Sequence, residues 1–505
     1  MAAQGGPKLA KSLSLWQVVG VSVALMAPSM AANINPQGSV GTVGRAVPLT
    51  FVIALVGVLF IAYVFARLTQ RFHHSGSVYG FVGATLGPRA GVIAGWSLMG
   101  TYIFYGLLTA MASAIFLTAL LQSLSIWSSP PGWAPFLVAA IELVGVWYLA
   151  IRPAKNGTRV LLGTELTTVA LIVILSVIVL IKLIVGHGPD GQHFTLTVFE
   201  PSQSVGFSAL FLGVVFGFLS FAGFEASATL GEESKHPRRD IPRAIVGTAI
   251  FGGIYFIFVT AVEVMGFGTS AHQLSTFANS GSLLGTLGST YIASWLGNVV
   301  TLGTVVSAFG CSLASTVGAS RLAYSLSRDS FGEKGIGVVN AKTGTPLRAT
   351  TLVVGVILLI SWVSALAFGA TAFDEFLWFG TIGTLIILFA YLLATIGAVV
   401  LLFFKERGSV STWEIILPIL AGVLIVYTLY RNVIPYPTGA SAWFPIVSGG
   451  WIIVGVVIIL SAPKLAAKVG NRLTQAEGLS LSASADTAEE RGQQRAEESP
   501  PITTD

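Results

Sequence analysis

Apolar segments of membrane-spanning length recur along nearly the whole chain. A helix needs about 20 apolar residues to cross the hydrocarbon core of a bilayer, and about twelve such segments can be counted, separated by polar connections. Only 10% of the 505 residues are charged, whereas soluble domains carry about 25%. The pattern predicts an all-α integral membrane protein whose polytopic domain occupies residues 13–464, with about twelve transmembrane helices.

The basic residues lie between the apolar segments instead of forming one cluster. If the N-terminus is inside, the outer connections hold only Arg45, Lys182 and Arg431, and nearly all other Lys and Arg residues lie in inner connections. Cytoplasmic connections of membrane proteins carry such an excess. We therefore expect a multi-pass protein of the cytoplasmic membrane with both termini in the cytoplasm, and no nucleic-acid partner.

Both ends of the chain differ from the apolar body. Residues 1–12 form a predicted cytoplasmic segment, although Lys8 and Lys11 before an apolar run are also compatible with a cleaved signal peptide. The end of the chain is rich in Ser, Ala, Gln and Glu and holds few large apolar side chains. Because such a composition cannot bury enough surface to fold, we expect a disordered cytoplasmic tail over residues 465–505.

One apolar segment carries a glutamate in its middle. Residues 220–233 read SFAGFEASATLGEE, inside a segment that starts near Gly206. A glutamate at membrane depth faces protein, water or a ligand, and is a functional candidate by default. Gly223 beside Glu225 allows the helix to break where the backbone lines a cavity. We predict a break here with Glu225 in or beside a binding site; alternatively, Glu225 accepts structural hydrogen bonds from neighbouring spans.

The first apolar segment is interrupted as well. Pro28 lies within ALMAPSMAANINPQG, where it removes a backbone donor and clashes with the carbonyl four residues earlier. A broken helix is predicted, with a short span ending at Ala27 and a polar outer loop as the alternative. Transporters with inverted repeats break the first helix of each half, and the two interruptions fall in spans one and six, five spans apart, as that architecture requires.

Broken helix ends expose unpaired backbone groups. The amides and positive dipole end that follow Pro28 suit a carboxylate, and the carbonyls at the break in the sixth span suit an ammonium group. Phe221 and Phe224 could close over the bound molecule. The predicted substrate-binding residues of these two stretches are Ala27, Ser29, Met30, Ala31, Ala32, Phe218, Ser220, Phe221, Ala222, Gly223 and Phe224.

Two glutamates are candidates for the group that couples transport to a proton. Glu225 is the first, and Glu165 in the polar patch TELTT of the fifth span is the second, unless that span begins later and Glu165 lies near the cytoplasmic surface. In the eighth span, Ser312, Ser315 and Thr316 offer hydroxyl groups for a possible sodium ion. Small hydroxyl residues are also ordinary packing residues in membrane helices. No cofactor or metal is expected.

Three segments resemble the amino acid–polyamine–organocation permeases. They are SGSVYGF after the second span, FAGFEASATLGEESKHPRRDIPRAI at residues 221–245, and RLAYSLSRDSFGEKG after the eighth span. The resemblance implies a five-plus-five inverted-repeat fold, with repeats over about 13–185 and 205–405 and two extra helices at about 412–464. It also implies alternating access and uptake of an amino acid or amine. Some proton-coupled members carry a lysine within the fifth span, but here the first lysine after Lys155 is Lys182 at the outer end.

The predicted function is therefore secondary active import of an amino acid by alternating access, with proton coupling. A polyamine or amine carrier, or an amino acid exchanger of the same fold, is the alternative, and sodium coupling stays open. An enzyme would need a nucleophile, base or metal ligands at one depth, which scattered glutamates do not supply. The expected partners are the small-molecule substrate, the coupling ion and the lipid bilayer.

Overall fold

The chain folds into helices throughout the part that the structure describes. The computed structural model describes residues 13–72, 77–152, 157–202, 205–230, 233–332, 334–340, 344–406 and 408–476. The predicted N-terminal segment 1–12 and the end of the predicted tail, 477–505, lie outside these residues.

Nine α-helices lie in the described residues up to Phe267. Their bounds are α1 (Leu15–Met26), α2 (Pro28–Val43), α3 (Val47–Arg71), α4 (Val78–Leu86), α5 (Pro88–Ser123), α6 (Ala134–Ala150), α7 (Gly157–Ile184), α8 (Phe207–Phe221) and α9 (Pro237–Phe267). The helices of the second half are α10 (Ala271–Ala278), α11 (Leu283–Tyr291), α12 (Ser294–Phe331), α13 (Leu347–Phe368), α14 (Ala372–Val399), α15 (Ile416–Arg431), α16 (Trp443–Ser461) and α17 (Pro463–Ala476).

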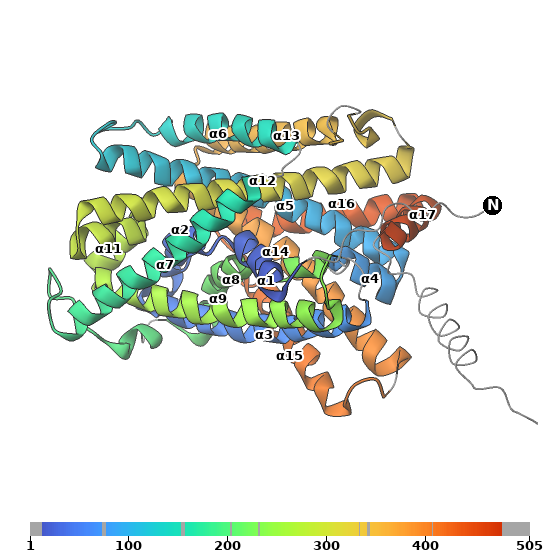
Figure 1. Ribbon diagram of the computed structural model, residues 1–505, viewed down its shortest axis with the longest axis horizontal. Coiled ribbons are helices and arrows are strands. Elements are labelled where there is room, and N and C mark those ends of the chain that lie inside the picture. The colour runs from blue at the N-terminus through green and yellow to red at the C-terminus, as the bar shows by residue number, and fades with distance from the viewer. Residues whose placement is uncertain are drawn as a thin grey trace, which may run out of the picture.

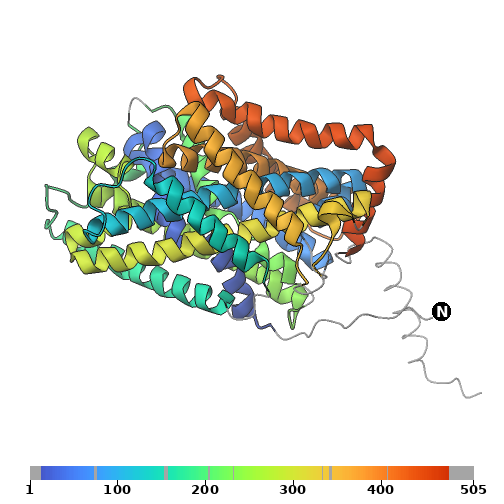
Figure 2. The ribbon, with the colours of Figure 1, turned by 90° about the horizontal axis from the view of Figure 1, so that it is seen from above.

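Most of the long helices run along the long axis of the molecule (Figure 1). α5 packs along α12 and α14, and α3 packs along α9. α6 and α13 lie together at one edge in Figure 1, with α15 at the opposite edge. Figure 2, seen from above, shows α16 along another edge. The short helices α1, α2 and α8 lie inside this frame, where they contact α9, α3 and α12.

The described helices are long and apolar enough for a membrane protein. Ten helical segments reach membrane-spanning length and hydropathy. One of them, Leu15–Arg71, contains α1, α2 and α3, and α6 is a shorter apolar helix of 17 residues. The predicted all-α integral membrane fold is confirmed. The count of about twelve spans and the inverted repeat stay predictions.

The predicted disordered tail begins later than expected. Residues 463–476 form α17, which packs against α4, α5 and α12 and buries Ala466 and Val469. The expectation of disorder is therefore wrong for residues 465–476. The sparse apolar side chains of this stretch lie on one face of a helix, which composition alone does not reveal.

The predicted break in the first span is present. α1 ends at Met26 because Ala27 adopts a left-handed conformation with a φ of 45°. Pro28 then occupies the first position of α2, where its missing N–H would have no helical partner in any case. Because a buried helix follows instead of a loop, the alternative of a polar outer loop is wrong.

The predicted break in the sixth span is present as well. α8 ends at Phe221, and residues 222–225 connect it to a short 3-10 helix, η3 (Ala226–Leu230). Gly223 in this connection has a φ of 101°, and a Cβ there would lie 2.9 Å from Leu25 Cβ. The backbone N–H of Ser227 also donates to Ser22 Oγ of α1 at 2.9 Å. The two interrupted helices thus touch each other at their breaks.

Gly223→Ala should destabilise this junction. A left-handed conformation costs an L-residue about 1–2 kcal/mol, and the added Cβ would press on Leu25. We expect a lower thermal unfolding temperature of the purified protein in detergent. Gly247→Ala in α9 is the matched control, because a Cβ there meets nothing within 4 Å and the backbone needs no positive φ. An unfolding temperature equal to that of the control would contradict this role of Gly223.

Candidate substrate-binding site

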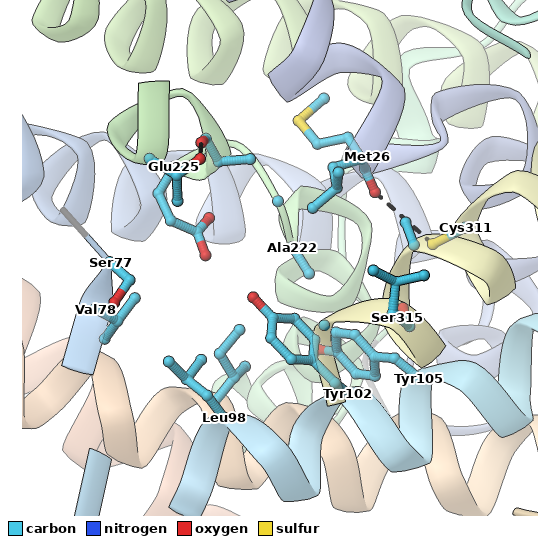
Figure 3. A pocket seen from close by; sticks show the side chains of 18 of the residues that line it. Met26, Ser77, Val78, Leu98, Tyr102, Tyr105, Ala222, Glu225, Cys311 and Ser315 are labelled. Carbon is cyan, nitrogen blue, oxygen red and sulfur yellow. Dashed lines mark hydrogen bonds between the residues drawn. The ribbon is translucent and has the colours of Figure 1, made fainter. Parts of the chain in front are cut away.

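A cavity of about 430 Å³ lies where the two broken helices meet. Its walls come from α1, α2, α3, α4, α5, α8, the connection to η3, α12 and α14. Most lining side chains are apolar or aromatic, and hydroxyl groups and two charged side chains lie among them; a mainly apolar wall with a limited set of polar groups is typical of a small-molecule site. Figure 3 shows side chains from these elements around the cavity.

Glu225 presents a carboxylate to this cavity. Its Oε1 atom accepts a hydrogen bond of 2.7 Å from the hydroxyl of Tyr391 in α14. Its Oε2 atom is buried and has no hydrogen-bond partner within the described part of the chain. The side chain points into the cavity, toward the Tyr102 hydroxyl and Leu98 on α5 (Figure 3). Since a buried carboxylate oxygen without a donor is unfavourable, the position suits a donor supplied by a ligand.

Charge in the cavity wall is sparse. Among the described lining residues only Glu225 and Arg321 are charged. Glu225 is 9% exposed, whereas Arg321 on α12 is exposed to solvent. The buried part of the cavity therefore carries a single described charged side chain, a carboxylate, which attracts a cation.

Glu165 of α7 places its carboxylate against the N-terminal end of α2. Its Oε1 atom accepts a hydrogen bond of 2.9 Å from the backbone N–H of Ser29. The next N–H, that of Met30, donates to Ser307 Oγ of α12 at 3.3 Å. Glu165 is 4% exposed and therefore buried within the protein. The first two of the amides that we expected to bind a substrate carboxylate are instead bonded to side chains of the protein.

The residues predicted for substrate binding, proton coupling and a sodium ion divide into those that line the cavity and those that do not. Five of them line the cavity, namely Met30, Ala222, Gly223, Glu225 and Ser315. The predicted residues that do not line it are Ala27, Ser29, Ala31, Ala32, Phe218, Ser220, Phe221, Phe224, Glu165, Ser312 and Thr316.

The two phenylalanines predicted to close over the substrate are packing residues. Phe221 lies against Phe256 with ring centroids 5.5 Å apart, and Phe224 lies against Phe65 at 6.2 Å. Both rings are fully buried. Ser220 has a structural contact too, because its hydroxyl accepts a hydrogen bond of 2.7 Å from Asn35 of α2. These residues hold the two breaks together beside the cavity.

The three hydroxyls predicted for a sodium ion do not converge. Ser312 donates to the carbonyl of Gly106 in α5 at 3.0 Å, and Thr316 also lies against Gly106. Ser315 faces the cavity instead. Ser312 and Thr316 are one helical turn apart and face α5 together, whereas Ser315 is directed to the cavity. In the described ranges, no group of three or more His, Cys, Asp or Glu residues could hold a metal ion.

Sequence reasoning missed Tyr391, the partner of Glu225. A tyrosine hydroxyl in an apolar span needs a hydrogen-bond partner, and this was the available signal. Tyr102 and Tyr105 of α5 also line the cavity. Tyr105 hydrogen-bonds through its hydroxyl to Thr384 of α14 at 3.2 Å, so α5 and α14 support the same wall.

The structure places two interrupted helices at a small-molecule cavity, within a bundle of membrane-spanning helices. This arrangement defines the class of secondary transporters, whose substrates bind at discontinuous helices near the bilayer midplane. The chain belongs to the amino acid permease family, whose model matches residues 13–459.

Curated relatives are transporters of amino acids and of an amine. A low-affinity putrescine importer of Escherichia coli strain K12 is 28% identical over 355 residues, covering 70% of this chain and 75% of the relative. A branched-chain amino acid permease of Bacillus subtilis strain 168 is 23% identical over 473 residues, covering 90% and 94%. The cationic amino acid transporter 4 of Mus musculus is 27% identical over 383 residues, covering 73% and 56%. The chain is accordingly an amino acid or amine transporter of this family.

Proposed function

We propose that the chain is a secondary active importer that binds the ammonium group of its substrate, an amino acid or an amine, at Glu225. The observation that carries this proposal is the Oε2 atom of Glu225, which is buried in the cavity wall without a described donor. A buried charge is strongly unfavourable unless it is paired, and a substrate ammonium group would pair with it. The names of the relatives, which include a putrescine importer and amino acid transporters, support the same chemistry.

We further propose that Glu165 couples transport to a proton. Its carboxylate joins α7 to the first turn of α2 through the Ser29 N–H, and an anion is stabilised at a helix N-terminus. Hydrogen bonds to an ionised acceptor are about twice as strong as neutral ones. Protonation of Glu165 would weaken the bond and free α2 to move relative to α7. Alternating access requires such movement between bundles.

The charge asymmetry supports the proposed orientation of the chain in the membrane. Basic residues concentrate in the connections that we assign to the cytoplasm. Arg321 lies in the cavity wall near one of these connections. This supports a cavity that communicates with the cytoplasmic side, and a chain with both termini in the cytoplasm of the cell membrane.

Uptake into proteoliposomes tests the proposal. Labelled amino acids and amines are offered while an inward proton gradient or an inward sodium gradient is imposed separately, with protein-free liposomes as the control for leakage. We expect accumulation above equilibrium under the proton gradient alone. If no amino acid or amine accumulated under either gradient, secondary import would be contradicted. Accumulation that required sodium would overturn the proton-coupling part.

A further inference from the structure

We infer that the substrate is an amine with one ammonium group, an apolar body and no carboxylate. This inference rests on the proposed transport through the cavity at Glu225. It follows from two features of the same site: a helix N-terminus closed by Glu165, and a cavity whose buried charge is a single carboxylate.

The first turn of α2 has no amide left for a substrate carboxylate. Pro28 has no N–H. The N–H of Ser29 donates to Glu165 Oε1 at 2.9 Å, and that of Met30 donates to Ser307 Oγ at 3.3 Å. The N–H of Ala31 donates to the Ala27 carbonyl at 2.9 Å. In transporters of this architecture such a half-helix N-terminus points at anionic substrate groups, but here every amide of the turn is used within the protein.

Charge also disfavours a substrate carboxylate at this end of α2. It would approach the carboxylate of Glu165, and like charges at close range repel strongly in a region without water. Neither Ser29 nor Glu165 lines the cavity. The described cation in the wall is Arg321, which is exposed, so that solvent and salt screen its attraction for an anion.

The rest of the cavity fits an apolar body with one cation. Glu225 is the one described carboxylate in the wall, and its free Oε2 accepts one ammonium group. Around it lie apolar side chains such as Leu25, Met30, Phe65 and Leu98. The other polar groups of the wall include hydroxyls such as those of Thr109 and Ser315, so a second ammonium group would meet no second carboxylate among the described lining residues.

Matched pairs of an amino acid and its decarboxylation product test the inference. Leucine with 3-methylbutylamine, and phenylalanine with phenethylamine, differ only in the carboxylate, while putrescine adds a second ammonium group. Equilibrium binding to the purified full chain is measured by titration calorimetry, and uptake is measured in parallel. We expect each monoamine to bind at least about tenfold more tightly than its parent amino acid and than putrescine, the effect of one charge-assisted hydrogen bond.

Glu165→Ala provides an independent measurement. Met30, the residue after Ser29, lines the cavity, so truncating Glu165 to alanine should open space between the freed Ser29 N–H and the cavity. We then expect the amino acids to gain affinity and the ratio of amine to amino acid affinity to fall by about tenfold. Glu142→Ala is the control. Glu142 lines a separate cavity of about 330 Å³ between α5, α6 and α12, and its replacement should leave the ratio unchanged.

The outcomes separate this inference from the proposed function. If the wild-type protein binds leucine, phenylalanine or putrescine more tightly than the monoamines, the inference is overturned while ammonium transport at Glu225 stands. If no amine and no amino acid binds or accumulates, the proposed function fails, and the inference fails with it. The wild-type affinities decide between these outcomes even if Glu165→Ala does not fold.

Discussion

Glu225→Gln should lower the uptake efficiency by at least about 100-fold. The substitution keeps the size of the side chain and an oxygen for the Tyr391 hydroxyl, but removes the negative charge that faces the cavity. Leaving a buried charge without its partner costs about 3–5 kcal/mol, and 1.4 kcal/mol corresponds to a tenfold change in affinity. The substrate ammonium would be that unpaired charge. The measurement is initial uptake rate against substrate concentration in proteoliposomes, with the amount of inserted protein determined for each variant.

Tyr391→Phe separates charge from hydrogen bonding at the same carboxylate. It removes the 2.7 Å bond to Oε1 but keeps the ring that packs against Phe65 at 5.5 Å. Because a hydrogen bond to a charged group contributes about 1.5–3 kcal/mol, we expect a smaller loss than for Glu225→Gln. If Glu225→Gln bound the substrate normally and lost only the dependence on pH, Glu225 would carry the coupling proton instead of the substrate.

The two helix breaks were predictable because they depend on local backbone chemistry. Pro28 removes a helical hydrogen bond wherever it lies inside an apolar span, and Gly223 is free to adopt the φ of 101° that the second break requires. The position of Glu225 beside a cavity was predictable for a similar reason, since an ionisable residue inside a span faces the protein interior or a cavity and not lipid. In these cases the residue type alone is enough to predict the local feature.

Contacts between distant segments were not predictable in the same way. Glu165 and Ser29 are 136 residues apart, and whether they meet depends on the rotation of α7 about its axis. The sequence indicates a polar patch in this helix but not the face that α2 covers. Similarly, Phe221 and Phe224 flank a break, where helical periodicity no longer relates neighbouring side chains. Their burial against Phe256 and Phe65 is a property of the packed bundle.

The two glutamates at the breaks differ in their hydrogen-bond partners and in whether they line the cavity. Glu225 has one bonded oxygen and one oxygen without a described donor, and it lines the cavity. Glu165 bonds to the end of α2 and does not line the cavity. A group that binds substrate must be reachable from the cavity, whereas a group that controls the position of a helix must be joined to it. This difference supports our proposal that substrate binding and proton coupling belong to different carboxylates.

Glu165→Gln should abolish concentrative uptake while preserving exchange. Glutamine resembles the protonated carboxyl group in shape and carries no charge, so it cannot switch between a strong and a weak hydrogen bond with the Ser29 N–H. Protonation of Glu165 in the wild-type protein weakens the hydrogen bond that its ionised carboxylate accepts from the Ser29 N–H. We therefore expect acidification of the outer solution to accelerate wild-type uptake and to have no effect on the variant. Counterflow of labelled substrate between equal pools should continue in the variant.

Glu263→Gln and Glu142→Gln are the controls for this prediction. Glu263 in α9 is fully buried, and neither of its carboxylate oxygens has a partner among the described residues, so no described hydrogen bond joins it to another helix. Glu142 lines the separate cavity beside α6. Both variants should keep gradient-driven accumulation. If Glu263→Gln lost it and Glu165→Gln kept it, the coupling proton would lie on α9, and the bond between Glu165 and α2 would be a structural contact that stays closed through the transport cycle.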